Sequence, residues 1–177
     1  LYNEGKSVQP LGEAIVHALE PQEHEFEVIL VDDGSTDDTH ARACGLADRD
    51  ERFQVLKLRK NFGQTAALRE GFDQARGDII ATMDGDLQND PEDIIPLVQK
   101  LREGYDVVAG WREDRKDGFW LRTLPSRTAN WLIRKITGTS VIDNGFALRV
   151  YHAEVVKGIP LYSEMHRLLP TLLALTG

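Results

Sequence analysis

One stretch of the chain indicates both its fold and its chemistry: residues 79–93, IIATMDGDLQNDPED. The apolar run at 79–83 predicts a buried strand. It ends in Asp84 and Asp86, two carboxylates that repel each other and have no apolar role there. Such a pair is tolerated mainly when a cation lies between the two groups, and Mg²⁺ or Mn²⁺ is commonly shared with substrate phosphates. The stretch therefore predicts a metal-dependent enzyme that acts on a phosphorylated donor.

The acidic pair has two other interpretations. An Asp-x-Asp on a solvated turn needs no metal, and this alternative stays open. An EF-hand calcium loop would place Asp84, Asp86 and Gln88 at its first, third and fifth positions. It is excluded because Asn89 stands where the sharp turn requires glycine, and Ile95 stands where a bidentate glutamate is needed.

The composition is that of one folded domain. The chain has 177 residues, of which 41% are hydrophobic and 28% charged, as expected for a globular protein with a single core. Its one cysteine, Cys44, excludes a disulfide framework and suits a reducing compartment. The chain opens at Leu1 without methionine, and a Leu-rich pattern is still running at 168–175. We therefore expect one domain over 1–177 that is cut at both ends.

Charge is distributed unevenly along the chain. The net charge of −8 argues against a general nucleic-acid binder. Basic residues nevertheless outnumber acidic ones between 111 and 135, which predicts a specific anionic partner. A helix face that simply carries solvated charge is the alternative, and it stays open. The basic residues of this segment are Arg112, Arg115, Lys116, Arg122, Arg127, Arg134 and Lys135.

Strand and helix patterns alternate along the first 110 residues. Near-continuous Val, Ile and Leu strands separated by helices predict an α/β fold, with a mostly parallel sheet covered by helices on both faces. Ligands of such sheets bind beyond the carboxyl ends of the strands. Polar groups at 32–33, 84–86 and 110–112 follow three of these strands, so we expect one rim to carry the site. The predicted strands are 26–31, 53–58, 78–83 and 105–109, and the predicted helices are 5–19, 36–48, 65–75 and 91–103.

The end of the first predicted strand, VDDGS at 31–35, is not a dinucleotide fingerprint, because it lacks Gly-x-Gly-x-x-Gly. Carboxylates repel a pyrophosphate, so Asp32 and Asp33 are expected to face the base or the ribose of a nucleotide. The alternative is that one Asp or Ser35 caps the next helix. Arg112 ends the strand at 105–109 and is placed to hold phosphate oxygens, and Gln88 is placed to add an oxygen ligand.

Residues 119–136 predict a helix, kinked near Pro125, in which Trp and Leu residues interleave with Arg and Lys. Tryptophan and arginine on one helix suit a membrane interface. A packed amphipathic helix whose charges face water is the alternative, and it stays open. A turn at 143–145 and a short strand ending at Tyr151 are predicted to follow.

Five motifs, in this order, resemble family-2 glycosyltransferases: LYNE at 1–4, VDDGSTD at 31–37, RKNFGQ at 59–64, MDGDLQNDP at 83–91 and YDVVAGWR at 105–112. The chain is most similar to the polyprenyl-phosphate sugar transferase branch, which includes dolichyl-phosphate mannose synthase and undecaprenyl-phosphate glucosyl and aminosugar transferases. The resemblance covers essentially the whole chain. It implies a GT-A fold, an inverting transfer and a Mg²⁺ or Mn²⁺ ion. It also implies that the start of the first strand and any C-terminal membrane segment lie outside residues 1–177.

The resemblance implies a role for individual residues. Contacts with the nucleoside would come from Tyr2, Glu4, Val31 and Asp33. The metal and the diphosphate would be held by Asp84, Gly85, Asp86 and Gln88. Phosphate groups, the acceptor's among them, would be held by Arg112, Arg122 and Ser126. Asp143 matches the position of a base or of an acid that orients the acceptor.

The chemistry of the acceptor separates two forms of the reaction. A hydroxyl must lose a proton as it attacks, so a general base would contribute ~10²–10⁴-fold. A lipid phosphate is already anionic and attacks directly, which leaves Asp143 as a positioning group and Arg122 and Arg127 as the source of attraction. The basic segment favours the lipid phosphate.

The sequence thus predicts an inverting transferase that moves a hexose from a UDP- or GDP-linked sugar to a polyprenyl phosphate, at the cytoplasmic face of a membrane (the inner membrane in a bacterium). Two alternatives are kept: a glycosyltransferase with a hydroxyl acceptor in a cell-surface glycan, and a silent module that binds nucleotide sugars. No nucleic-acid partner is expected. The sequence leaves open whether the protein is a homo-oligomer.

Overall fold

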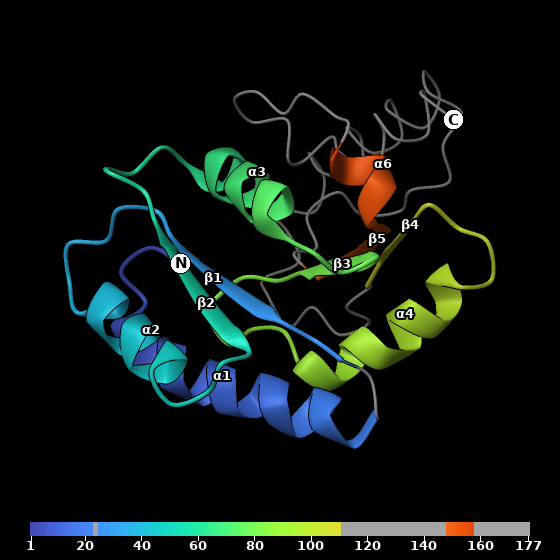
Figure 1. The fold of residues 1–177 in the computed structure, drawn as a ribbon, viewed down its shortest axis with the longest axis horizontal. Coiled ribbons are helices and arrows are strands. Elements are labelled where there is room, and N and C mark those ends of the chain that lie inside the picture. The colour runs from blue at the N-terminus through green and yellow to red at the C-terminus, as the bar shows by residue number, and fades with distance from the viewer. Residues whose placement is uncertain (23–24, 111–147, 158–177) are drawn as a thin grey trace, which may run out of the picture.

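A computed structural model describes residues 1–22, 25–110 and 148–157 of the chain (Figure 1). Helices and strands alternate through its first part: α1 (Gly5–Leu19), the 3₁₀ helix η1 (Glu20–Gln22), β1 (Val28–Asp32), α2 (Thr39–Ala47), β2 (Phe53–Lys57) and α3 (Gln64–Gln74). The second part holds β3 (Ile79–Thr82), the 3₁₀ helix η2 (Pro91–Asp93), α4 (Ile94–Leu101), β4 (Val107–Ala109), β5 (Arg149–His152) and α6 (Ala153–Lys157).

The strands pair in two groups. β1 and β2 are parallel neighbours, with Leu30 opposite Val55. β5 lies between β3 and β4 and runs antiparallel to both, so Val150 is opposite Ala81 on one side and Val108 on the other. The predicted α/β class is confirmed. The antiparallel β5 lets β3 and β4 keep the same direction, although they are not direct neighbours.

Helices cover both sides of the strands: α1, α2 and α4 lie on one side, and α3 and α6 lie on the other (Figure 1). One core joins α1 to the first strand pair, where Val8, Leu11 and Ile15 pack with Leu30 and Phe53. These helix positions follow the spacing of an amphipathic helix that buries one face. A second core lies beneath α3 and α6 and consists of Phe72, Tyr151 and Val156. The rings of Phe72 and Tyr151 meet edge to face, with centroids 5.8 Å apart.

Most predicted elements are confirmed, with shifts at their ends. The predicted helix at 36–48 begins only at Thr39, because the backbone N–H groups of residues 35–36 bond to side chains from other segments instead of starting a helix. The segment 91–103 begins as a 3₁₀ turn, and Asp90 accepts a hydrogen bond from the Glu92 N–H as the cap of that turn. Helix α6 was not predicted. The helix predicted at 119–136 and the turn at 143–145 lie outside the described residues.

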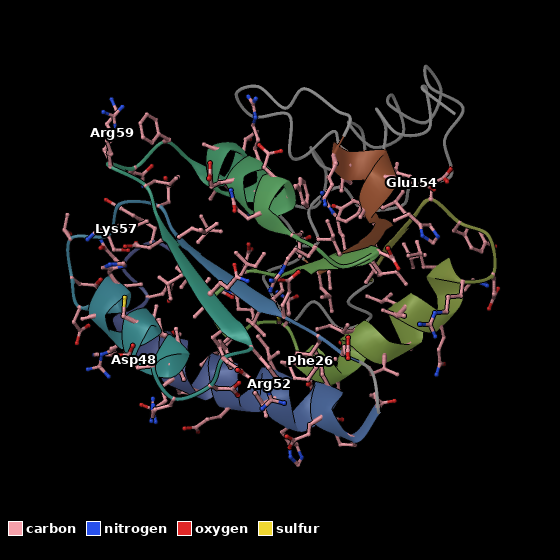
Figure 2. The ribbon with its side chains drawn as sticks, in the orientation of Figure 1. Phe26, Asp48, Arg52, Lys57, Arg59 and Glu154 are labelled. Atoms are coloured by element: carbon pink, nitrogen blue, oxygen red, sulfur yellow. The ribbon has the colours of Figure 1, made fainter. Side chains whose placement is uncertain are left out.

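The two ends of the first strand pair differ in character. At the amino end, Arg52 pairs with Asp50 at 2.7 Å, and its guanidinium lies 4.8 Å from the centre of the Phe26 ring (Figure 2). Lys57 and Arg59 lie at the opposite, carboxyl end of β2 (Figure 2). An ion pair over an aromatic ring thus occupies the amino end of the strand pair. The carboxyl ends of the strands, called the carboxyl rim from here on, are where ligands of such a sheet bind. No helix in the described ranges is both long and apolar enough to cross a membrane.

Glu27 fixes the far end of α3, whose first residue belongs to the carboxyl rim. Burial opposes ionisation of Glu27, but hydrogen bonds from the backbone N–H and the guanidinium of Arg76 outweigh this and hold the pKa of the carboxyl group below its usual value. The Arg76 N–H donates to Oε1 at 2.7 Å and the Gly77 N–H donates to the same oxygen at 3.3 Å. A single carboxylate therefore ends α3 and joins it to the start of β1.

We expect Glu27→Gln to lower the free energy of unfolding at pH 7 by about 1 kcal/mol, because the charge-assisted hydrogen bonds are lost. A carboxylate with a lowered pKa in the native state stabilises the fold above its unfolded pKa, and this contribution disappears as pH falls through the native pKa. The free energies of unfolding of wild type and variant should therefore become equal below about pH 4. Urea unfolding followed by circular dichroism measures both. Glu51→Gln, on an exposed turn, is the control. A difference that persists unchanged at pH 3 would contradict this explanation.

Candidate active site at the carboxyl rim

Asp32, the last residue of β1, is turned into the protein. Its side chain is completely buried, and its Oδ1 accepts a hydrogen bond from the Ser35 N–H at 2.9 Å. Its Oδ2 lies 3.7 Å from Nδ1 of His40 on α2. The expectation that Asp32 faces the base or ribose of a nucleotide is therefore wrong. Its carboxylate instead shapes the turn that follows β1.

Asp33 ties this turn to the segment that precedes α3. Its two carboxylate oxygens accept hydrogen bonds from the backbone N–H groups of Phe62 and Gly63, at 2.8 Å and 2.9 Å. The side chain is only 5% exposed. Gly34 follows with φ +69°, and a Cβ on it would lie 2.3 Å from the carbonyl carbon of Lys60. The two loops therefore touch backbone to backbone, a contact that only glycine permits.

The segment 2–5 lies against the same turn. The Asn3 N–H donates to Oγ of Ser35 at 2.9 Å, and Oδ1 of Asn3 accepts from the Thr36 N–H at the same distance. Asn3 has φ +56°, a conformation that asparagine tolerates better than most residues. The Glu4 N–H donates to Oγ1 of the buried Thr39 at 2.8 Å. This docking leaves Tyr2 45% exposed at the rim.

The end of β3 comes to the same place. Gln64, the first residue of α3, donates from Nε2 to Oδ1 of Asp84 at 2.8 Å. Gly85 packs so closely against Leu1 that a Cβ on it would lie 2.2 Å from a Leu1 methyl group. The rim therefore joins the ends of β1 and β3, the start of α3 and the N-terminal segment.

Acidic side chains gather around the backbone of Leu1 at this rim. The carboxylates of Asp32, Asp33, Asp84 and Glu4 all lie within electrostatic reach of the Leu1 nitrogen. Four carboxylates thus lie within electrostatic reach of one point. Their mutual repulsion favours a bound cation at the rim.

Asp86 lies in a strained turn beyond β3. Its Oδ1 accepts from the Gln88 backbone N–H at 3.1 Å, and Leu87 between them has φ +62° with its side chain 46% exposed. A leucine rarely adopts a positive φ, and backbone strain of this kind is common where a loop positions functional groups. The turn keeps Asp86 close to Asp84 at the end of the strand.

The residues at the rim fit a divalent cation. In the parts of the chain that the structure describes, no group of three His, Cys, Asp or Glu side chains forms a complete protein cage for a metal. Asp84 and Asp86 supply two carboxylates. Mg²⁺ is usually bound by one or two carboxylates, together with substrate phosphates and water. The donor set therefore matches a cation that a phosphorylated ligand helps to hold.

The structure thus gathers the sequence-predicted residues Tyr2, Glu4, Val31, Asp33, Asp84, Gly85, Asp86 and Gln88 at one rim. Arg112, Arg122, Ser126, Arg127 and Asp143 lie outside the described residues. Sequence reasoning gave no role to Asn3 or Gln64, although both stand in motifs that carried the family resemblance. Asn3 stands next to Glu4 in the first motif, which was a signal that could have identified it, whereas Gln64 ends a motif without acidic residues and had no such signal.

Comparison with known proteins identifies the family. The family described as glycosyl transferase family 2 matches residues 1–163. The chain therefore belongs to glycosyltransferase family 2. It is 48% identical, over 176 residues, to dodecaprenyl-phosphate galacturonate synthase of Rhizobium johnstonii, covering 98% of this chain and 52% of that protein.

A second relative is the undecaprenyl-phosphate 4-deoxy-4-formamido-L-arabinose transferase of Pseudomonas syringae. It is 39% identical over 173 residues, which cover 97% of this chain and 51% of the relative. The chain thus spans about half the length of the curated relatives it matches. Both names support the polyprenyl-phosphate branch that the sequence motifs indicated.

Solved structures support the GT-A fold. The mannosyltransferase of Pyrobaculum calidifontis, solved with GDP-mannose and Mn²⁺, matches with a TM-score of 0.68 and 18% identity, over 100% of this chain and 50% of that one. This likeness concerns the fold alone. The predicted GT-A class is therefore confirmed.

The close contact between the two rim loops gives a stability prediction. We expect Gly34→Ala to lower the free energy of unfolding by more than about 2 kcal/mol, because a side chain is strained at this φ and meets the Lys60 backbone. Gly45→Ala is the matched control. A Cβ at this position in α2 meets nothing within 4 Å, and the substitution should stabilise the helix by roughly 0.5–1 kcal/mol. If chemical denaturation gave the same change in the free energy of unfolding for both variants, the proposed loop contact would be contradicted.

Proposed function

We propose that this chain is the catalytic domain of an inverting glycosyltransferase that moves a sugar from a nucleoside diphosphate to a polyprenyl phosphate. The observation that carries the proposal is the acidic rim, where Asp84 and Asp86 lie beside a buried Asp33 turn, in a chain 48% identical to a dodecaprenyl-phosphate galacturonate synthase. We assign the nucleoside to Tyr2, Glu4, Val31 and Asp33. We assign the diphosphate and its cation to Asp84, Gly85, Asp86 and Gln88.

The donor is a UDP- or GDP-linked sugar in this proposal, and a hexose or its uronic acid is the first sugar to test. The names of the two relatives carry galacturonate and a formamido-pentose, which supports a polar or charged sugar. Mn²⁺ in the mannosyltransferase structure supports a divalent cation here, Mg²⁺ or Mn²⁺. When bound, such an ion neutralises charge on the departing nucleoside diphosphate.

The reaction needs little proton chemistry when the acceptor is a phosphate. A phosphate oxygen of the lipid attacks the anomeric carbon, and the bond from that carbon to the diphosphate breaks with inversion. The nucleoside diphosphate leaves with the bonding electrons. Arg112, Arg122, Ser126 and Arg127 hold phosphate groups of donor and acceptor, and Asp143 orients the acceptor. Basic residues that bind the donor diphosphate and the acceptor phosphate separately hold the two anions side by side, although the anions would otherwise repel each other.

The membrane is the expected location of the acceptor. Arg and Lys interleave with Trp and Leu at 119–136, a pattern that suits the boundary between lipid head groups and acyl chains. The basic residues of that segment would attract both an anionic surface and the phosphate of the lipid. We therefore place the domain at the cytoplasmic face of a membrane.

Removal of the acidic pair should abolish metal-dependent donor binding. With a nucleotide at 100 times its dissociation constant, the wild type should gain roughly 2.7 kcal/mol, or about 5–10 °C in thermal midpoint for a chain of this size. UDP, GDP, CDP and dTDP would each be measured with Mn²⁺ and with chelator. Asp84→Asn and Asp86→Asn should lose the shift and at least about 100-fold in transfer rate.

Asp73→Asn is the matched control, since Asp73 lies exposed on α3 and pairs with Arg69 only at 3.9 Å. It should bind and react like the wild type. Full transfer activity in Asp84→Asn and Asp86→Asn would overturn the proposed site. Donor binding without any release of nucleoside diphosphate would favour the silent module instead.

The variant Asp143→Asn distinguishes a phosphate acceptor from a hydroxyl acceptor. With a polyprenyl phosphate as acceptor, Asp143→Asn should keep transfer within about tenfold of the wild type, because no proton has to be removed. Arg122→Gln and Arg127→Gln should raise the KM for the lipid. Radiolabelled sugar recovered in the lipid fraction measures both effects. If Asp143→Asn loses ~10³-fold or more while lipid concentration has no influence, a hydroxyl acceptor with a general base is the correct reaction.

A further inference from the structure

A cysteine, a histidine and an aspartate lie next to one another beside the turn that follows β1. His40 and Cys44 are one turn apart on α2, and Nε2 of His40 lies 3.7 Å from Sγ of Cys44. The other ring nitrogen, Nδ1, lies 3.7 Å from Oδ2 of Asp32. A nucleophile, a base and a carboxylate that orients the base follow one another in this order in enzymes with a reactive cysteine or serine.

The carboxylate of Asp32 has an unsatisfied oxygen on the side of His40. Asp32 is completely buried, and its Oδ1 accepts the Ser35 N–H. Oδ2 of Asp32 and Nδ1 of His40 are both buried, and neither has a hydrogen-bond partner among the described residues. A buried charge without a donor is costly, so a hydrogen on Nδ1 is favoured here. The imidazole then keeps the lone pair of Nε2 for the proton of the sulfur.

The sulfur end of this arrangement is partly open to solvent, whereas the carboxylate end is closed. Cys44 is partly buried, and the side chain of His40 is 33% exposed. Two positions beside Cys44 on α2 carry little or no side chain. Ala41 is exposed, and a Cβ built on Gly45 meets nothing within 4 Å. These two positions leave room for a small reagent beside Sγ.

We propose that Cys44 is a modification site whose thiol exchanges with low-molecular-weight disulfides, with His40 as the base and Asp32 as the residue that positions the base. The proton of Sγ passes to Nε2 of His40, and the sulfur attacks one sulfur of the disulfide. The S–S bond of the reagent breaks as the new S–S bond to Cys44 forms. One half of the reagent stays as a mixed disulfide, and the other half leaves as a thiolate and takes up a proton.

This chemistry is independent of sugar transfer, because neither His40 nor Cys44 has a role in the proposed donor site. Residues one turn apart on a helix are neighbours in any case, so the distance between Sγ and Nε2 would prove little by itself. The independent observation is the completely buried oxygen of Asp32 on the other side of the ring, which accepts no hydrogen bond from the described residues. It gives the ring the orientation and the tautomer that a base needs.

The rate at which Cys44 reacts with the uncharged disulfide dithiodipyridine tests the proposal. Cys44 is the only cysteine of the chain, so release of thiopyridone reports one sulfur. At neutral pH the native chain should react at least as fast as the same chain in guanidinium chloride, although its sulfur is partly covered. His40→Gln should lower the native rate at least about tenfold. His17→Gln, at an exposed position of α1, is the matched control and should react like the wild type.

The variant Asp32→Asn tests whether this carboxylate positions the ring. The Ser35 N–H needs the asparagine oxygen, so the amide nitrogen faces His40 and donates to Nδ1. The ring hydrogen then moves to Nε2, which can no longer accept the proton of Sγ. Nitrogen NMR chemical shifts of the imidazole report its tautomer, and the His40 signals are those that disappear in His40→Gln. We expect a hydrogen on Nδ1 in the wild type, Nε2–H alone in Asp32→Asn, and a reaction at least about tenfold slower in this variant.

Three results would overturn the proposal. A native rate below that of the denatured chain would mean that Sγ is shielded rather than activated. Equal native rates in the wild type and His40→Gln would mean that His40 is not the base. A wild-type ring with hydrogen on Nε2 alone would mean that Asp32 does not position it. Circular dichroism shows whether each variant is folded, and if Asp32→Asn is not, the other two measurements still decide.

Discussion

The carboxylate of Asp33 is the interaction on which the rim depends. It accepts two backbone N–H groups, from Phe62 and Gly63, while it is almost fully buried. Charge-assisted bonds to backbone donors are among the stronger hydrogen bonds in proteins, and they are costly to leave unmade in the interior. Because these donors precede α3, the same carboxylate fixes the start of that helix, and with it Gln64 and its bond to Asp84.

The arrangement of charge at the rim follows from this constraint. Both oxygens of Asp33 and Oδ1 of Asp32 accept backbone N–H groups, and Oδ2 of Asp32 is buried 3.7 Å from Nδ1 of His40. These two residues therefore place negative charge near Asp84 from inside the protein. One hydrogen bond to Asp84 comes from the neutral amide of Gln64. A neutral amide leaves the negative charge of the carboxylate in place. The rim therefore keeps a negative potential in the position where a divalent cation and a diphosphate are expected to meet.

Much of this organisation could be predicted from the sequence because it depends on periodicity and on local composition. The strands at 53–57 and 79–82 and the helix at 5–19 appear close to their predicted limits, since each has an unambiguous apolar pattern. The inward orientation of Asp32 could not be predicted. Both aspartates at 32–33 are buried, and nothing local shows that their carboxylates accept backbone N–H groups of the loops that follow β1 and β2. The antiparallel direction of β5 depends on connections between distant segments and has no local signature either.

Gln64 shows why the site residues were found only in part. Carboxylates at strand ends are conspicuous because charge there is unusual, whereas a glutamine that begins a helix is common. Its importance arises only when Asp33 fixes the backbone at 62–63, after which the first side chain of α3 reaches β3. The acidic residues supply the chemistry, and a hydrogen-bonded loop far from them in sequence decides where that chemistry is placed. Precision at such a rim is therefore a property of the tertiary contact between loops, which no single motif contains.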